Sequence, residues 1–326
     1  MSEREGTPGG WLRRNRVEAL LILLFVGALA WFGWLGYSLM PPGWLDQWMI
    51  WKTPASTRFS GELALRHAQA QCDLGPRPVA SPAHRRLQEM IGKELAARGW
   101  IVERQTFTYR ETPGVNLIAR PSRERDATAP IALIGAHYDT RRLADNDPDP
   151  AKRRQPVLGA NDGASGVAVL LELTRSLDVT RSPYRVRLAF FDAEDNGRLD
   201  GWEFIAGSTF MAQALTPQTR PSLVVVVDMV GDADQQLYFD NNSDPTLRAE
   251  LWRIAAELGY GSAFIPQVKW SMLDDHTPFA QLGIPAVDII DFDYPYWHTA
   301  ADTCDKLSAQ SLERVGRTLE VFLEGK

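Results

Sequence analysis

The sequence predicts an α/β fold, a doubly wound and mostly parallel mixed sheet with helices on both faces. Three observations support this prediction. Short, continuous apolar runs such as Leu133–His137 and Leu223–Asp228 are typical of buried parallel strands. From Leu133 onward these runs alternate with helical patterns, as in βαβ units. Several runs also end in His or Asp, and ligands of open α/β sheets bind just outside the carboxyl ends of the strands.

The composition of the 326-residue chain is that of a globular protein, with 44% hydrophobic and 23% charged residues. A formal net charge of −6, without a basic stripe, argues against nucleic acid as a partner. Two cysteines, Cys72 and Cys304, are too few for a disulfide framework or a thiolate metal site. The sequence leaves open whether they pair or stay free.

A transmembrane anchor is predicted at residues 17–40, after a cytoplasmic tail at residues 1–16. The run Ala19–Met40 carries no charge and is long enough for the roughly 20 residues that span a bilayer. Arg13, Arg14 and Arg16 lie just before it, and this predicts a single-pass membrane protein with a cytoplasmic N-terminus and an exported C-terminal domain.

A cleaved signal peptide is the alternative to an anchor. The small residues at Gly27–Ala30 resemble a cleavage site. Cleavable signals, however, have apolar cores of about 7–15 residues. Here the apolar run continues past Ala30 through Trp31 and Phe32, so we expect an uncleaved anchor.

Residues 41–59 are predicted to be a linker, and residues 60–326 a single domain without internal repeats. Pro76, Pro78 and Pro82 interrupt the chain between the first two expected helices. The expected helices are Glu62–Gln71, Ala83–Ala97, Val167–Leu177, Pro245–Leu258 and Ser308–Phe322, and the two expected strands before the alternating region are Trp100–Tyr109 and Asn116–Ala119.

The stretch Arg187–Gly197 is an apolar run that ends in three acids, Asp192, Glu194 and Asp195. Three such carboxylates repel one another strongly unless a positive charge lies among them. A single acidic turn of this kind is often just a solvated loop. The pattern recurs, however, at several predicted strand ends, and this indicates a metal site.

The candidate ligands are the His and Asp residues at strand ends, at a helix start and in a late loop. They are His137, Asp162, Asp195, Asp228 and His298. Each alone has an ordinary explanation, since an Asp that opens a helix is often an N-cap. Together, imidazole and carboxylate groups without thiolate suit zinc in a catalytic setting.

Five motifs make the resemblance to a known family specific. They are HYDT (137–140), GANDGASG (159–166), FFDAED (190–195), DMVG (228–231) and WHT (297–299). Their order and spacing resemble those of zinc-dependent aminopeptidase-like enzymes, from about Ser60 to the last residue. Two activities share that fold, the dizinc aminopeptidases and the animal-type glutaminyl cyclases, which work with one zinc.

The resemblance implies a role for each matching residue. Asp162, Asp195 and His298 match the zinc ligands common to both branches, and Glu194 matches the general acid/base. His137 and Asp228 match the positions that hold a second zinc, together with the bridging aspartate, in aminopeptidases. One zinc is therefore expected and a second is possible. The chain departs from the family at Asp195, where Glu is common.

Three features favour the cyclase branch. Asp274 is the first of the paired aspartates before a histidine, as in cyclases, and is expected to act in catalysis beside Asp228. Trp297, just before the ligand His298, and Trp202 resemble tryptophans of the cyclase substrate pocket, although packing is the alternative role for both. Two departures are Asp288, where animal cyclases tend to have histidine, and a shorter loop at 291–296.

The sequence thus predicts a zinc-dependent catalytic domain at residues 60–326. It would convert the N-terminal glutamine of peptides or proteins to pyroglutamate, with Glu194 as general acid/base. The first alternative is a dizinc aminopeptidase, in which Glu194 activates water against the first peptide bond. The second is a catalytically inactive, anchored binding domain, which the intact Glu194 and ligand set disfavour.

Overall fold

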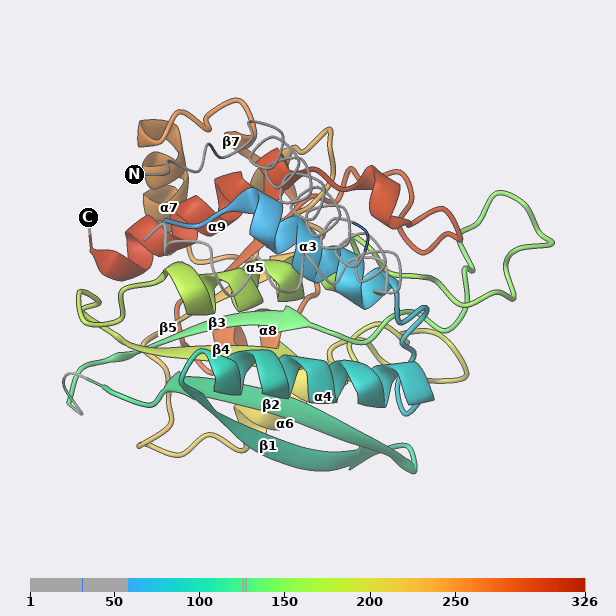
Figure 1. Cartoon of the computed structure of the whole chain (residues 1–326), viewed down its shortest axis with the longest axis horizontal. Helices are drawn as coiled ribbons and strands as arrows, with labels where there is room; N and C mark the ends of the chain where they lie inside the picture. The colour runs from blue at the N-terminus through green and yellow to red at the C-terminus, as the bar shows by residue number, and fades with distance from the viewer. Residues whose placement is uncertain (1–30, 32–57, 125, 127, 326) are drawn as a thin grey trace, which may run out of the picture. The chain divides into compact units, whose positions relative to one another are not determined.

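A six-stranded mixed sheet lies at the centre of the computed structural model, which describes residues 31, 58–124, 126 and 128–325 (Figure 1). Its strand order is β1-β2-β4-β3-β5-β8. The strands are β1 (Trp100–Tyr109), β2 (Thr112–Pro121), β3 (Ile131–His137), β4 (Arg185–Phe191), β5 (Leu223–Asp228) and β8 (Ala286–Ile290). The last four run parallel, and the β1–β2 hairpin joins β4 antiparallel. The predicted α/β class and mixed sheet are confirmed.

The two faces of the sheet are covered by different helices. Along β3, Ala132 and Ile134 belong to the larger hydrophobic core and Leu133 to a second, smaller core, because side chains alternate between the faces of a strand. The larger core includes residues of α3 (Gly61–Cys72), α4 (Pro82–Ala97), α5 (Ala164–Ser176), α7 (Pro245–Glu257) and α9 (Ala309–Glu324), and the smaller core includes residues of α6 (Ala206–Gln213) and α8 (Thr277–Gln281).

The register of the parallel strands brings their carboxyl ends to one edge of the sheet. His137, the last residue of β3, pairs with Phe191, the last residue of β4. Asp228, the last residue of β5, pairs with Ile290, the last residue of β8. The loops that follow these strands therefore begin side by side, where ligand sites of open α/β sheets lie.

Serine side chains mark the start of two predicted helices. Ser60 accepts a hydrogen bond from the amide of Leu63 at 3.4 Å, and Ser308 accepts one from the amide of Ser311 at 3.4 Å. The sequence did not predict α8 or the two-stranded parallel sheet of β6 (Leu237–Asp240) and β7 (Phe264–Trp270).

A disulfide joins Cys72 at the end of α3 to Cys304 in the short 3₁₀ helix Cys304–Lys306, with Cα atoms 6.5 Å apart. The sequence left this pairing open. The bond connects residues 232 positions apart, so it ties α3 to the chain just beyond His298. An N-terminal helix is thereby linked covalently to the loop that carries one of the candidate metal ligands.

The contacts of the chain separate Met1–Ala55 from Ser56–Lys326, and every strand and helix named here belongs to the second unit. The predicted anchor at residues 17–40 lies, Trp31 apart, outside the described residues. Among the residues that the structure describes, none of the helices has both the length and the apolar character needed to cross a bilayer.

Candidate metal centre and active site

Five sequence-predicted ligands meet at the carboxyl edge of the sheet, and all five are buried. His137 and Asp228 end strands β3 and β5, and Asp195 follows β4. Asp162 lies just before α5, and His298 lies in the loop after β8. Residues that are far apart in the sequence thus converge on one site, as the predicted strand ends required.

The ligand atoms form two groups that share Asp162. Within each group, one atom from each residue lies within 4.8 Å of the others. In the first group, His298 Nε2 lies 2.8 Å from Asp195 Oδ1 and 3.6 Å from Asp162 Oδ2. In the second, His137 Nε2 lies 3.1 Å from Asp162 Oδ1 and 3.2 Å from Asp228 Oδ1. Asp162 can therefore contribute one oxygen to each group.

The chemistry of these groups fits a zinc ion. Oδ2 of Asp162 and Oδ2 of Asp195 are buried, and neither has a hydrogen-bond partner in the part of the chain that the structure describes. Buried carboxylate oxygens without partners are costly unless a cation satisfies them. Two carboxylates and one imidazole are the donor types of a catalytic zinc site with an open position.

The crowding of carboxyl groups shows in their pKa values. Burial raises the pKa of Asp195 to about 6, and the neighbouring charge of Asp162 adds to this rise. Burial also raises the pKa of Asp228 to about 7. A divalent cation among these groups would favour their ionised forms and offset the cost of burying them together.

Three residues beside the site have a left-handed backbone, although none is glycine. They are Ala193 (φ 57°), Met229 (φ 46°) and His298 (φ 57°). Ala193 directly precedes Glu194, and Met229 directly follows Asp228. Non-glycine residues in this region cost of the order of 1–3 kcal/mol each, and such strain clusters at active sites. The surrounding structure holds these turns so that the side chains reach one point.

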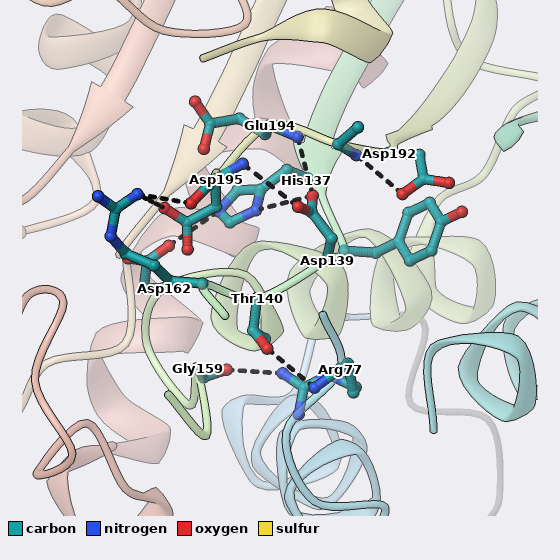
Figure 2. Close-up of polar contacts among 12 residues, drawn as sticks. Arg77, His137, Asp139, Thr140, Gly159, Asp162, Asp192, Glu194 and Asp195 are labelled. Atoms are coloured by element: carbon teal, nitrogen blue, oxygen red, sulfur yellow. Dashed lines mark hydrogen bonds and ion pairs between the residues drawn. The ribbon is translucent and has the colours of Figure 1, made fainter. Parts of the chain in front are cut away.

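Two buried aspartates hold the main chain of the site. Asp139 accepts hydrogen bonds from the amides of Glu194 at 3.0 Å and Asp195 at 3.2 Å (Figure 2). Asp302 in the same way accepts from the amide of Asp162 at 3.2 Å. These bonds fix the positions of the ligand loops, as partners in the outer shell of metal sites commonly do.

Asp192 also holds the acidic turn. Its Oδ1 accepts from the amide of Ala193 at 2.8 Å and lies 2.8 Å from His84 Nε2. His84 is itself buried in α4 and stacks on Tyr138. The turn that presents Glu194 is therefore clamped by Asp139 and Asp192 together.

A cavity of about 270 Å³ opens beside the two ligand groups. Glu194 and Asp274 line it, as does Trp297, whose indole ring lies against His298. Trp202 does not line this cavity. It packs edge to face on Tyr109, with ring centroids 5.2 Å apart, and this favours the packing role over the pocket role.

Glu194 has the properties of a general acid/base. Burial raises its pKa well above the usual value for glutamate, and the nearby charge of Asp195 adds to the rise, while His137 opposes it. A raised pKa brings a carboxyl group closer to the operating range of an acid–base catalyst near neutral pH.

Asp274 belongs to a second group of buried acids. Its charge contributes to the raised pKa of Asp228 and of Asp288, in both cases after burial itself. His276 lies between two members of the surroundings, with Nε2 3.3 Å from Asp240 Oδ2 and Nδ1 3.9 Å from Asp288 Oδ2. His276 is thus surrounded by buried carboxyl groups and belongs to neither candidate ligand group.

Several residues around the site were not predicted from the sequence. The aromatic residues Phe204, Trp270 and Phe292 line the cavity. Arg141 was missed too; it is buried and donates to the carbonyl oxygen of Asp195 at 2.7 Å. A single phenylalanine or arginine in a sequence does not indicate a site by itself, because its neighbours are known only once the loops are folded.

Comparisons with known proteins agree with this geometry. A glutaminyl-peptide cyclotransferase of Boiga dendrophila is 25% identical over 303 residues, covering 78% of this chain and 79% of the relative. The structure of a Tannerella forsythia glutaminyl cyclase superposes with a TM-score of 0.74 and 30% identity, over 82% of this chain and 99% of that one. A leucine aminopeptidase precursor of Bacteroides thetaiotaomicron superposes with a TM-score of 0.77 and 29% identity, over 82% and 98%.

The resemblance inferred from the five motifs is thereby confirmed. The sequence profile of peptidase family M28 matches residues 116–323, and this segment contains all the residues of both ligand groups as well as Glu194 and Asp274. Because the match spans more than half of the sequence and the fold agrees with it, the chain belongs to peptidase family M28.

Proposed function

We propose that this protein is a glutaminyl-peptide cyclotransferase that acts on peptides or proteins with an N-terminal glutamine. The observation that carries the proposal is a small cavity with two buried carboxyl groups, Glu194 and Asp274, beside the indole of Trp297. Relatives named glutaminyl-peptide cyclotransferase and solved structures named glutaminyl cyclase support it.

The reaction is a ring closure within the substrate. The α-amine attacks the side-chain amide carbon, a C–N bond forms, the bond to the amide nitrogen breaks, and ammonia leaves. Glu194 accepts the proton of the attacking amine and passes it to the departing nitrogen, a role worth roughly 10²–10⁴-fold in rate. Asp274, with Asp228, holds the amine against the amide carbon, and proximity supplies much of the remaining acceleration.

For the cofactor, we propose one zinc ion held by Asp162, Asp195 and His298. A bound zinc ion would polarise the amide carbonyl of the substrate and stabilise the negative charge that develops on its oxygen. His137 and Asp228 complete a second group that could take another ion. Metal analysis of purified protein is expected to give about one zinc per chain, and about two if the second group fills. A protein that contains no zinc and keeps full activity after exhaustive chelation contradicts this assignment.

The second group, His137, Asp162 and Asp228, favours a second candidate function, a dizinc aminopeptidase. The decisive experiment offers the purified full-length protein a Gln-peptide and a Leu-peptide and identifies the products by mass. Pyroglutamyl peptide with ammonia supports the cyclase. Free leucine, without ammonia from the Gln-peptide, assigns the protein to the aminopeptidases instead.

We further propose that residues 17–40 anchor the protein in a membrane, with residues 41–59 as linker and residues 60–326 as an exported catalytic domain. The uncharged run Ala19–Met40 supports an anchor. The Cys72–Cys304 disulfide supports an exported domain, because disulfides persist in oxidising compartments. Leu24→Arg should weaken insertion, by about 2.5–3.5 kcal/mol for a central charge. A mature N-terminus near Trp31 would instead identify a cleaved signal peptide.

A further inference from the structure

Arg77 is a fully buried cation that plays no part in the chemistry proposed above. It lies between α3 and α4, and its side chain is 0% exposed. The guanidinium donates to four main-chain carbonyl oxygens: those of Gln71 at 3.2 Å, Gly75 at 3.1 Å, Leu158 at 2.9 Å and Gly159 at 2.7 Å. The first two belong to its own segment, and the last two begin the loop that leads to Asp162.

The main chain of Arg77 joins a second site loop. Its amide donates to Thr140 Oγ1 at 2.8 Å, and its carbonyl oxygen accepts from the amide of Thr140 at 3.2 Å. Thr140 closes the HYDT motif, three residues after His137. Figure 2 shows Arg77 joined by dashed lines to both Thr140 and Gly159, well away from Glu194 and Asp195. One residue thus holds the loops that present His137 and Asp162.

The space at this junction leaves no room for a side chain at position 159. Its backbone is left-handed, with φ +66°, and an added Cβ would lie 2.3 Å from Thr140 Cγ2 and 2.6 Å from the carbonyl oxygen of Asp162. The loop is therefore packed against Thr140 on one side and bonded to Arg77 on another. A shift of Arg77 would therefore break the hydrogen bonds that hold the chain leading to Asp162.

Arg77 also supplies positive charge behind the site. The acids that favour its charged form are, in order, Asp302, Asp139 and Asp162. Burial lowers the pKa of Arg77 to about 10, which still leaves the guanidinium charged at neutral pH. Two of these acids hold the main chain of the site, and the third is the shared ligand. A neutral residue at position 77 would leave them without that charge.

We propose that Arg77 is a positioning residue for the metal centre, which fixes the Asp162 loop in its ligand geometry and balances the buried negative charge behind it. The proposal rests on the zinc site proposed above, and it is independent of which substrate the enzyme takes. It differs from a purely structural clamp in one measurable way: removal of the guanidinium should weaken zinc binding and should not merely lower the stability of the fold.

The test compares Arg77→Met and Arg77→Lys with the wild-type full-length protein. Zinc affinity is measured by competition with a chromogenic chelator, and ligand geometry by the visible absorption of the cobalt-substituted protein. Glu320→Gln is the matched control, since Glu320 is also buried and binds a main-chain amide, that of Phe59 at 3.0 Å, but belongs to α9 and to neither ligand loop.

Arg77→Met should bind zinc about 10–100-fold more weakly than the wild type, the usual cost of losing a partner that orients metal ligands. Its cobalt spectrum should shift, and zinc should raise its melting temperature less than it raises that of the wild type. Arg77→Lys should recover part of the affinity, because lysine keeps the charge but lacks the fork that reaches several carbonyls. Glu320→Gln should keep wild-type affinity and spectrum.

Equal zinc affinity and an unchanged cobalt spectrum in the Arg77 variants would overturn the proposal, even if their melting temperatures fell. If Arg77→Met does not fold, Arg77→Lys decides the question by the same two measurements. Failure of the cyclase assignment looks different: the wild type would bind zinc, the Arg77 variants would lose affinity, and the Leu-peptide would be cleaved.

Discussion

The indole ring of Trp297 stacks on the imidazole ring of His298, with centroids 3.8 Å apart and planes inclined by 29°. A wall of the cavity is therefore built directly onto a candidate metal ligand. The rings of Trp297 and Phe292 in turn meet edge to face, with centroids 4.9 Å apart. A flat aromatic wall beside the candidate metal site suits a substrate whose side chain must fold back toward its own amine.

Trp297→Ala should raise KM for an N-terminal glutamine substrate while leaving kcat and zinc content nearly unchanged. The substitution removes a binding surface and no proton carrier, and the loss of apolar contact of this size is worth about 1–3 kcal/mol, or roughly 10–100-fold in KM. Steady-state kinetics and metal analysis check it. Trp202→Ala is the control, because Trp202 packs on Tyr109 outside the cavity. Equal KM changes in both variants contradict the assignment.

Asp274→Ala should lower turnover of a Gln-peptide by about two orders of magnitude or more, the scale of losing one acid–base partner, with zinc content nearly unchanged. Hydrolysis of a Leu-peptide needs no carboxylate at this position, so the variant also separates the two candidate activities. Leu273→Ala is the control for local disturbance of the loop, because Leu273 is the residue before Asp274, is exposed and carries no carboxyl group. Glu194→Gln should abolish either activity. An Asp274→Ala enzyme with wild-type turnover would falsify the role given to this residue.

The free energy of unfolding should decrease as the pH falls below 6.5, because His67 is held neutral in the folded protein. His67 is half-buried in α3, and this burial, followed by the charges of Arg98, Arg66 and Arg175, lowers its pKa to about 3, against 6.5 for an unperturbed histidine. Between these values only the unfolded chain binds the proton, so the contribution of neutral His67 is fully present above pH 6.5 and is lost as the pH falls. One proton changes the free energy of unfolding by at most about 1.4 kcal/mol per pH unit.

His67→Gln should therefore flatten the pH dependence of unfolding between about pH 4 and pH 6.5. Urea denaturation of wild type and variant at each pH measures this. The difference between the two proteins cancels contributions that they share, including loss of metal in acid. Parallel curves for the two proteins would show that His67 does not titrate in this way.

Replacing both cysteines, Cys72→Ser with Cys304→Ser, should lower the free energy of unfolding by about 2–4 kcal/mol, because the bond restricts a long loop of the unfolded chain. Urea denaturation with and without reductant checks it. The double variant should be insensitive to reductant. The prediction fails if reductant destabilises wild type and variant alike.

The sequence alone predicted that the candidate ligands lie at one edge of the sheet. Buried parallel strands are apolar runs, and His137, Asp195 and Asp228 stand at or just after the ends of three such runs. It did not reveal β7, since Pro266 and the exposed positions 267–269 read as a loop. Such an edge strand depends on its neighbour β6, and the pairing of two short segments leaves no periodic signal.

The supporting residues were harder to predict than the ligands. Arg77 stands between two prolines, where arginine is ordinarily a solvated loop residue, and its four carbonyl partners come from segments up to 82 positions away. The pairing of Cys72 with Cys304 was equally hard to predict, because the two residues are 232 positions apart. Phe204, rather than the predicted Trp202, lines the cavity, because the turn at residues 198–202 carries the tryptophan toward Tyr109.

The disulfide also sets an order of events in biosynthesis. Cys72 cannot meet its partner until the 232 positions that separate it from Cys304 have been synthesised. His298 arrives only shortly before that partner. During translation, α3 therefore carries an unpaired thiol while the site still lacks a ligand. The residues that close the covalent ring and complete the candidate ligand set are therefore synthesised almost together, so a nascent chain lacks both until translation is nearly finished.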